Sequence, residues 1–350
     1  MSTRRHFLMA MAAGAAWTLT RRAHAGVPQG PQPGSPKEGQ VQLPPGGVMP
    51  MRELGRTGVK VSLLGLGGYH IGLPKEEKEA VRIIHAAMDH GVNFLDNCWD
   101  YNEGESERRM GLALAGGRRQ KAFLMTKLDG RTRESATQQL EQSLRRLATD
   151  VIDLVQIHEV IRPDDAERVF AAGGAIEALV AAQKAGKLRF IGFTGHKSPD
   201  IHLHMLEVAE RHGFRFDTVQ MPLNVMDPHY ASFEKRVLPV LRAKNIGVLG
   251  MKPLGSGIIL KSGAVTAVEC LQYSMSLPTS VVITGCDTMG VLEQGLATAY
   301  GFQPMKQEQV VALLQRTASP GAHGKFERFK TTTDFDGTTH NPKWLDTATL

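Results

Sequence analysis

Eight short apolar runs recur along this chain at intervals of roughly 30 residues, and a helical pattern follows each of them. The runs lie near residues 62–66, 92–96, 122–127, 153–158, 189–194, 217–221, 246–251 and 280–285. Between them, apolar residues recur at helical spacing, for example over 76–90, 133–147, 175–185 and 232–244. Eight strands that are each followed by a helix predict a closed parallel (β/α)8 barrel, or TIM barrel, rather than an open sheet.

The barrel has additions at both ends. Residues 51–54 and 59–61, joined through Gly55 and Gly58, predict an N-terminal β-hairpin. A C-terminal extension begins at about residue 301, with a predicted helix over 307–317 and an aromatic-containing tail beyond it. Residues 51–350 are therefore predicted to be one barrel domain with its extension. The sequence leaves two positions open for the tail, across the barrel mouth or over a helix elsewhere.

The first 25 residues have the pattern of an export signal. Arg4 and Arg5 precede a weakly hydrophobic stretch, and Ala23-His24-Ala25 has the form of a cleavage site. The paired arginines resemble a twin-arginine (Tat) signal, although Met9 stands where a Lys is common. The resemblance implies export by the Tat machinery, in the folded state, to the periplasm. The alternative is an uncleaved amphipathic tail.

Residues 26–50 are rich in Pro and Gly, and they predict a disordered linker. The net charge of +6 includes four arginines in the first 25 residues, which contain no acid, so removing these four charges leaves +2. A small excess of this kind without a basic cluster gives no reason to expect nucleic-acid binding. The mature region has no apolar run long enough to span a membrane. The three cysteines have neither metal-site nor disulfide spacing.

Four polar residues stand at or just beyond the carboxyl ends of three successive strand-like runs: Asp96, Tyr101, Lys127 and His158. In a barrel these ends converge on one mouth, so the four side chains are expected to meet. A Tyr is a poor acid at its usual pKa of about 10, but a neighbouring ammonium can lower that pKa. We therefore expect Lys127 to lower the pKa of Tyr101 and Asp96 to pair with Lys127. Such a group is suited to the reduction of a carbonyl, with His158 orienting the carbonyl oxygen.

At these positions the chain resembles the aldo-keto reductase family over residues 51–300. The tetrad of that family is similar to Asp96, Tyr101, Lys127 and His158, with the same five-residue separation between Asp and Tyr. The resemblance implies reduction of an aldehyde or ketone to an alcohol, or the reverse, by hydride transfer from NADP or NAD, with Tyr101 as general acid or base.

The same resemblance implies the cofactor contacts. Thr194 and Gly195 stand where a Ser-Asn pair usually holds the carboxamide, and Gln220 matches a second carboxamide ligand. Met251 replaces an aromatic residue that often stacks on nicotinamide. The remaining implied cofactor residues are Gly68, Tyr69 and Asp96 near the nicotinamide and Lys252, Leu254 and Ser256 near the pyrophosphate.

The choice between NAD and NADP stays open. Family members that prefer NADP place Lys or Arg after the eighth strand, and none occurs here between Val281 and Tyr300. Asp287 would repel a 2′-phosphate and could instead accept a hydrogen bond from a ribose hydroxyl. Family precedent favours NADP, and the local charge favours NAD.

Other functions are weaker alternatives. No metal site is predicted, because His202 and His204 diverge on a helix and lie in the wrong barrel unit, even with His196 nearby. A non-catalytic barrel that binds nucleotide as a sensor or partner subunit would usually lose the tetrad. An exported hydrolase would need two carboxylates, for which Asp100 and Glu159 are the available pair. Trp99 beside these acids suggests a pocket for a polar or polyhydroxylated carbonyl compound.

Overall fold

The strands close into one parallel barrel, which the computed structural model describes within residues 35–346. Around the barrel the strands follow the order β10-β3-β4-β5-β6-β7-β8-β9. Their bounds are β3 Leu64–Gly67, β4 Phe94–Leu95, β5 Phe123–Leu128, β6 Ile152–Ile157, β7 Leu188–Thr194, β8 Thr218–Pro222, β9 Gly247–Met251 and β10 Val281–Gly285. All eight predicted runs appear, with ends shifted by at most two residues, so the predicted (β/α)8 fold is confirmed.

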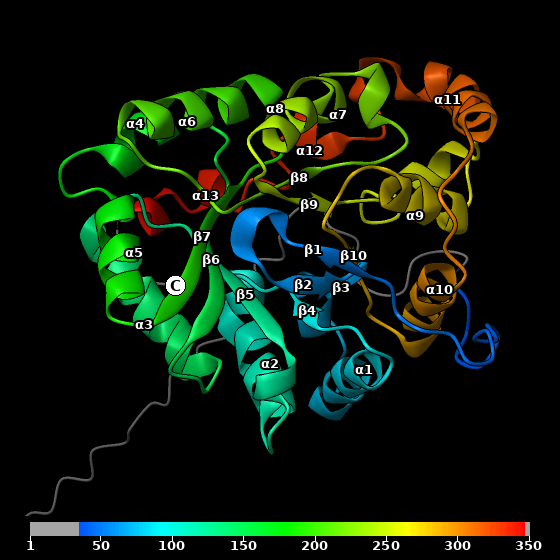
Figure 1. Cartoon of the computed structure of the whole chain (residues 1–350), viewed down its shortest axis with the longest axis horizontal. Coiled ribbons are helices and arrows are strands. Elements are labelled where there is room, and N and C mark those ends of the chain that lie inside the picture. The colour runs from blue at the N-terminus through cyan, green and yellow to red at the C-terminus, as the bar shows by residue number, and fades with distance from the viewer. Residues whose placement is uncertain (1–34, 347–350) are drawn as a thin grey trace, which may run out of the picture.

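Helices form a ring outside the strands (Figure 1). They are α1 Glu77–Asp89, α2 Glu105–Leu114, α3 Arg133–Arg146, α4 Asp165–Phe170, α5 Ala175–Lys184, α6 Pro199–Arg211, α7 Phe233–Arg236, α8 Leu238–Ala243, α9 Ala267–Ser276 and α10 Met289–Tyr300. The single helix predicted over 232–244 is wrong, because the chain breaks at Val237 into α7 and α8. Pro239 lies in the first turn of α8, where its ring and missing N–H are tolerated, whereas one continuous helix would place it in the interior.

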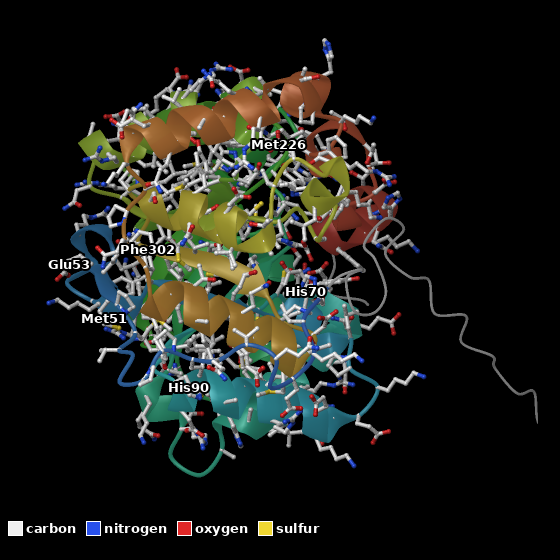
Figure 2. The ribbon with its side chains drawn as sticks, turned by 90° about the vertical axis from the view of Figure 1, so that its right-hand side faces the viewer. Met51, Glu53, His70, His90, Met226 and Phe302 are labelled. Carbon is white, nitrogen blue, oxygen red and sulfur yellow. The ribbon has the colours of Figure 1, made fainter. Side chains whose placement is uncertain are left out.

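The N-terminal hairpin closes the amino end of the barrel. Strands β1 (Met51–Glu53) and β2 (Lys60–Ser62) pair antiparallel, and Leu54 and Val61 beside them are fully buried. They belong to one apolar cluster with Phe94 and other residues on the inside of the barrel. Figure 1 shows the hairpin across this end of the barrel, and Figure 2 shows Met51 and Glu53 there, with His70 further along the barrel. The hairpin leaves the opposite end, at the carboxyl ends of the strands, uncovered for a functional site.

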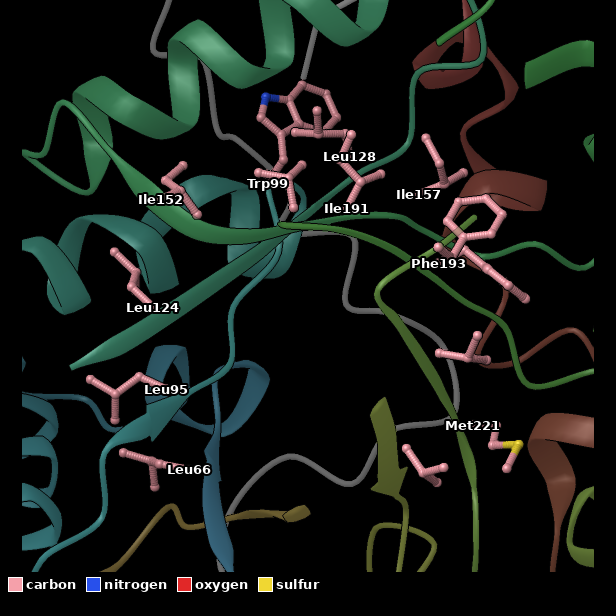
Figure 3. Packing of buried hydrophobic residues seen from close by; sticks show 14 of the residues in the cluster. Leu66, Leu95, Trp99, Leu124, Leu128, Ile152, Ile157, Ile191, Phe193 and Met221 are labelled. Atoms are coloured by element: carbon pink, nitrogen blue, oxygen red, sulfur yellow. The ribbon is translucent and has the colours of Figure 1, made fainter. Parts of the chain in front are cut away.

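The main core lies between the strands and the helices. Successive strand residues point to opposite faces, so Leu66, Leu95, Leu124 and Ile191 face outward and pack in this layer (Figure 3). Each is at most 2% exposed, and burying such a side chain contributes about 1.5–3 kcal/mol. The core therefore holds the strands in register and fixes the positions of the residues at their carboxyl ends.

Residues 35–50 contain no helix or strand, but they lie against the barrel. Glu38 pairs with Arg82 on α1 at 2.7 Å, and the backbone N–H of Gly39 donates to Glu293 on α10 at 2.8 Å. A disordered tether would make no such fixed contacts. This part of the predicted disordered linker is therefore ordered on the surface of the domain.

The predicted signal peptide, residues 1–25, and the linker up to residue 34 lie outside the described residues. Within residues 35–346 no helix is both long and apolar enough to cross a bilayer.

The C-terminal extension crosses the barrel mouth, which answers the question that the sequence leaves open. It contains α11 Gln307–Gly321, α12 Arg328–Thr331 and α13 Gly337–His340. The backbone N–H groups of Gly337 and Thr338 each donate to Glu159, just after β6, at 2.8 Å. Lys330 on α12 is buried and pairs with Asp227 at 2.7 Å. The tail is thus anchored on both sides of the mouth by buried polar contacts.

Candidate active site

The structure brings the four strand-end residues into one group at the mouth. Lys127, near the end of β5, donates from Nζ to the Asp96 carboxylate and, at 3.2 Å, to the Tyr101 hydroxyl. The same ammonium lies 4.6 Å from the centre of the Tyr101 ring. The His158 ring stands edge-on to Tyr101, with ring centres 5.8 Å apart. Three of the four side chains are therefore connected directly through one ammonium, and His158 flanks the phenol.

A tight turn holds Tyr101 in this place. The two residues after it, Asn102 and Glu103, have φ angles of 54° and 59°, in the left-handed region that non-glycine residues seldom adopt. Asn102 donates to the carbonyl oxygen of Tyr69 at 2.9 Å, which ties the turn to the loop after β3. Such strained backbone is typical of functional sites, where the surrounding structure fixes it.

Asp129 is a site residue that the sequence analysis missed. Its Oδ1 lies 2.8 Å from Nδ1 of His158, and both residues are buried. A carboxylate at this nitrogen fixes the ring orientation and leaves the other ring nitrogen for a ligand. Asp129 follows β5 directly, two residues after Lys127, so its position at the mouth could have been read from the strand end.

Burial determines the ionisation of the catalytic group. It raises the pKa of Tyr101 well above its usual range near 10, and the nearby carboxylate of Asp96 adds to this. The net lowering of this pKa that the sequence led us to expect is therefore not found in the described structure, where burial and the neighbouring carboxylates raise it. Burial also raises the pKa of Asp96, although Lys127 opposes this, and lowers the pKa of His158. Tyr101 is consequently a protonated phenol at neutral pH, the form that can donate a proton.

This raised pKa predicts opposite pH profiles for the two reaction directions. Carbonyl reduction needs the phenol, so kcat for reduction should show no loss attributable to Tyr101 up to about pH 9.5. Alcohol oxidation needs the phenolate, so its kcat should still be rising at that pH. Steady-state assays at saturating cofactor from about pH 5.5 to 9.5 would check both profiles. A fall in the reduction rate with a midpoint near pH 8 would mean that the pKa of Tyr101 is lowered.

A cavity of about 440 Å³ extends from this group across the mouth. Among the residues predicted to contact cofactor, those that line it are Gly68, Tyr69, Asp96, Thr194, Gln220, Met251, Lys252, Leu254, Ser256 and Asp287. Gly195 does not line it. A Cβ atom on Gly195 would come within 2.2 Å of the carbonyl oxygen of Val160, so this glycine serves a close backbone approach.

Two neighbouring residues differ from their expected roles in the pocket. Trp99, predicted as a pocket wall, is fully buried, donates to Gln142 at 2.7 Å and does not line the cavity. Asp100 and Glu159 do line it. However, Glu159 accepts hydrogen bonds from the tail at both carboxylate oxygens, so its position anchors the tail.

The tail and two histidines add lining residues that the sequence analysis did not assign to the pocket. These are His70, His196 and Phe335. His196 lies 2.9 Å from the Asp336 carboxylate of the tail. Burial lowers the pKa of both histidines to about 4, so both rings are neutral at physiological pH. Both of these rings therefore line the mouth in the neutral form, His196 beside the tail and His70 in the loop after β3.

The histidines of α6 do not converge on one point. His202 is buried between the rings of Phe193 and Phe233, whereas His204 lies near the surface and contacts Glu167 at 2.6 Å. This divergence agrees with the helical geometry that argued against a shared metal site.

Comparison with known proteins gives a consistent result. The sequence model of the aldo/keto reductase family matches residues 63–267. An uncharacterized oxidoreductase of Bacillus subtilis, YrpG, is 31% identical over 237 residues, which cover 61% of this chain and 70% of that protein. L-galactose dehydrogenase of Arabidopsis thaliana is 26% identical over 300 residues, covering 74% of this chain and 91% of that protein.

A solved structure shares the fold. It is that of an aldo-keto reductase from Bacillus halodurans in its holo form, with 22% identity and a TM-score of 0.64. The similarity covers 79% of this chain and 99% of that chain, so the barrel and most of its connections correspond.

Proposed function

The chain belongs to the aldo/keto reductase family and is an NAD(P)H-dependent oxidoreductase, and from this we propose that Tyr101 is the proton donor in the reduction of a polar carbonyl compound. The observation that carries the proposal is the Lys127 ammonium, which bonds Asp96 and Tyr101 at the floor of the cavity. In the reverse direction the same phenol would accept the proton of an alcohol. A bound nicotinamide supplies the hydride.

The chain's own residues would divide the proton chemistry among them. Tyr101 gives its hydroxyl proton to the carbonyl oxygen as negative charge develops there, and the Lys127 ammonium stabilises the phenolate that remains. Asp96 holds Lys127 in place through their buried ion pair. His158, oriented by Asp129 at 2.8 Å, positions the carbonyl oxygen through its other ring nitrogen.

Two orphaned acceptors support the fit of a nicotinamide dinucleotide. Gln220 Oε1 and Asp287 Oδ2 are buried at the cavity and have no hydrogen-bond partner within residues 35–346. Leaving such atoms unpaired costs about 1–3 kcal/mol each. The amide group of nicotinamide and a ribose hydroxyl are donors that would satisfy them. Thr194, Gln220 and Met251 lie on the neighbouring strands β7, β8 and β9, and this supports the proposal that they would hold the carboxamide end of the cofactor beside the tetrad.

We further propose that NADH binds more tightly than NADPH. The adenosine end of the cavity, which we define as the part lined by the loop after β10, contains the acid Asp287. No Lys or Arg lines this end in the described structure. Fluorescence titration of the purified domain should give an NADH dissociation constant at least about tenfold lower than that of NADPH. The substitution Asp287→Ser removes the negative charge and should narrow this difference. Equal affinities in the unsubstituted protein would reject the assignment.

Neither alternative function gains support from the geometry. The hydrolase requires Asp100 and Glu159 to act as a pair, but the tail occupies both oxygens of Glu159. A non-catalytic nucleotide-binding barrel would bind cofactor without turnover. Measured turnover that depends on Tyr101 separates the two functions.

The N-terminal pattern supports a proposal about location. We propose that Arg4 and Arg5 direct Tat export to the periplasm, with cofactor loaded before export. Cell fractionation of the full chain, compared with the variant Arg4→Lys/Arg5→Lys, is the test. Equal amounts of both proteins in the periplasm would reject it.

A further inference from the structure

Lys252 is a second lysine at the cavity, and the tetrad does not use it. It follows β9 directly and lines the cavity. Its φ angle is 56°, in the left-handed region, which costs a non-glycine residue about 1 kcal/mol or more. The backbone therefore holds an unfavourable conformation that sets the direction of this side chain.

Two aromatic rings of the tail contact the Lys252 ammonium. Nζ lies 4.9 Å from the ring centre of Phe335 and 5.4 Å from that of Phe329. The faces of aromatic rings attract cations but supply no counter-charge. Within residues 35–346 the ammonium has neither a hydrogen bond nor an ion pair, unlike Lys127, which Asp96 neutralises. Burial lowers the pKa of Lys252 to about 8, so most of it is charged at neutral pH.

The ammonium lies in the catalytic half of the cavity. The charges of Glu159, Lys127, Asp336 and Asp96 all influence the pKa of Lys252. Burial lowers the pKa of His70 in the loop after β3, and the charge of Lys252 lowers it further. The resemblance implies that Lys252 contacts the pyrophosphate, but its ammonium lies over the rings of Phe329 and Phe335 in the tail.

We infer that Lys252 binds a carboxylate group carried by the carbonyl substrate, an inference that rests on the proposed function. An ammonium that lines the same cavity as the tetrad and makes no direct ion pair within residues 35–346 is suited to one negative charge. A phosphate dianion fits less well, because no arginine lines the cavity to bind it in a bidentate manner. The carboxylates of Asp100 and Glu159 also line the cavity and would repel two negative charges more than one. The substrate class is thus an oxo acid: an aldehyde or ketone that also bears a carboxylate.

Matched aldehydes provide the test. Reduction of 3- and 4-carboxybenzaldehyde is compared with that of benzaldehyde, in the unsubstituted protein and in the variant Lys252→Met. The ratio of kcat/KM for the better carboxylated aldehyde to that for benzaldehyde should fall about 10- to 100-fold in the variant, as expected for the loss of one charged hydrogen bond. The control is Lys325→Met, which removes an exposed ammonium lying 5.4 Å from the Phe326 ring outside the cavity.

A binding measurement makes the result independent of turnover. The corresponding carboxylated alcohol and benzyl alcohol are titrated into the protein saturated with NADH, where no hydride transfer can occur. The carboxylated alcohol should bind more tightly, and Lys252→Met should remove the difference. NADH affinity is measured in the same variants.

The outcomes separate this inference from the proposed function. Reduction of both aldehyde classes without a carboxylate preference would overturn the role of Lys252 and leave the proposed function standing. If Lys252→Met loses affinity for NADH while the ratio of kcat/KM between the two aldehydes is unchanged, Lys252 binds the cofactor pyrophosphate and not the substrate. A binding preference that depends on Lys252, without any turnover, would support the carboxylate site and count against Tyr101 chemistry.

Discussion

The variant Tyr101→Phe should lose carbonyl reduction by a factor of about 10² to 10⁴, because it removes the proton donor while keeping the ring. The ring should stay in place, since its edge contacts with Tyr69 and His158 do not involve the hydroxyl. Nucleotide affinity and thermal stability should change little. The measurements are kcat for an aldehyde, the dissociation constant for NADH and the melting temperature of the same preparation.

Tyr230→Phe is the matched control for Tyr101→Phe. Tyr230 is 37% exposed and does not line the cavity, so the same chemical change there should leave turnover intact. Undiminished turnover in Tyr101→Phe would contradict the proton-donor role.

The variant Lys127→Met should impair both catalysis and folding. Asp96 is 4% exposed and would lose its charged partner, and an unpaired buried charge costs about 3–5 kcal/mol. Tyr101 would also lose the ammonium that stabilises its phenolate, so kcat should fall at least about 100-fold. Chemical denaturation would give the change in the free energy of unfolding, and kcat would be measured below the unfolding transition.

The double variant Asp96→Asn/Lys127→Met separates the two effects. It removes both charges, so much of the lost stability should return, whereas turnover should remain low because Tyr101 still lacks the ammonium. Lys325→Met, an exposed lysine of the tail, controls for the change of side chain. Recovery of turnover together with stability would show that Lys127 acts only as a structural partner of Asp96.

Much of the fold could be predicted because barrel strands are buried on both faces. Such strands appear in a sequence as continuous apolar runs, and the structure places all eight within two residues of their predicted ends. The break between α7 and α8 was missed, since the apolar spacing continues through Val237 and only Pro239 indicates it. The order of residues 35–50 was missed because it depends on contacts with α1 and α10, which composition cannot show.

The tetrad positions could be predicted from the strand ends, but their electrostatics could not. A sequence shows that Lys127 is near Tyr101, yet it does not show how far burial opposes the effect of that charge. The tail was harder still. Phe335 reaches the cavity from a segment about 50 residues beyond the last strand, and no periodicity in the sequence fixes that position. Lys252 likewise could not be placed against the tail before its rings were located.

Isotope labelling would follow hydride transfer from the cofactor to the substrate. The protein would be incubated with 4-carboxybenzaldehyde or benzaldehyde and NADH that carries deuterium at C4 of the nicotinamide, on one face or on the other. The deuterium content of the product alcohols would be determined by mass spectrometry. We expect one deuterium at the former carbonyl carbon from one face of the cofactor, and a fall of about 10² to 10⁴ in the rate at which the labelled alcohol forms in Tyr101→Phe. Alcohol formed without deuterium from either face would contradict direct hydride transfer in this cavity.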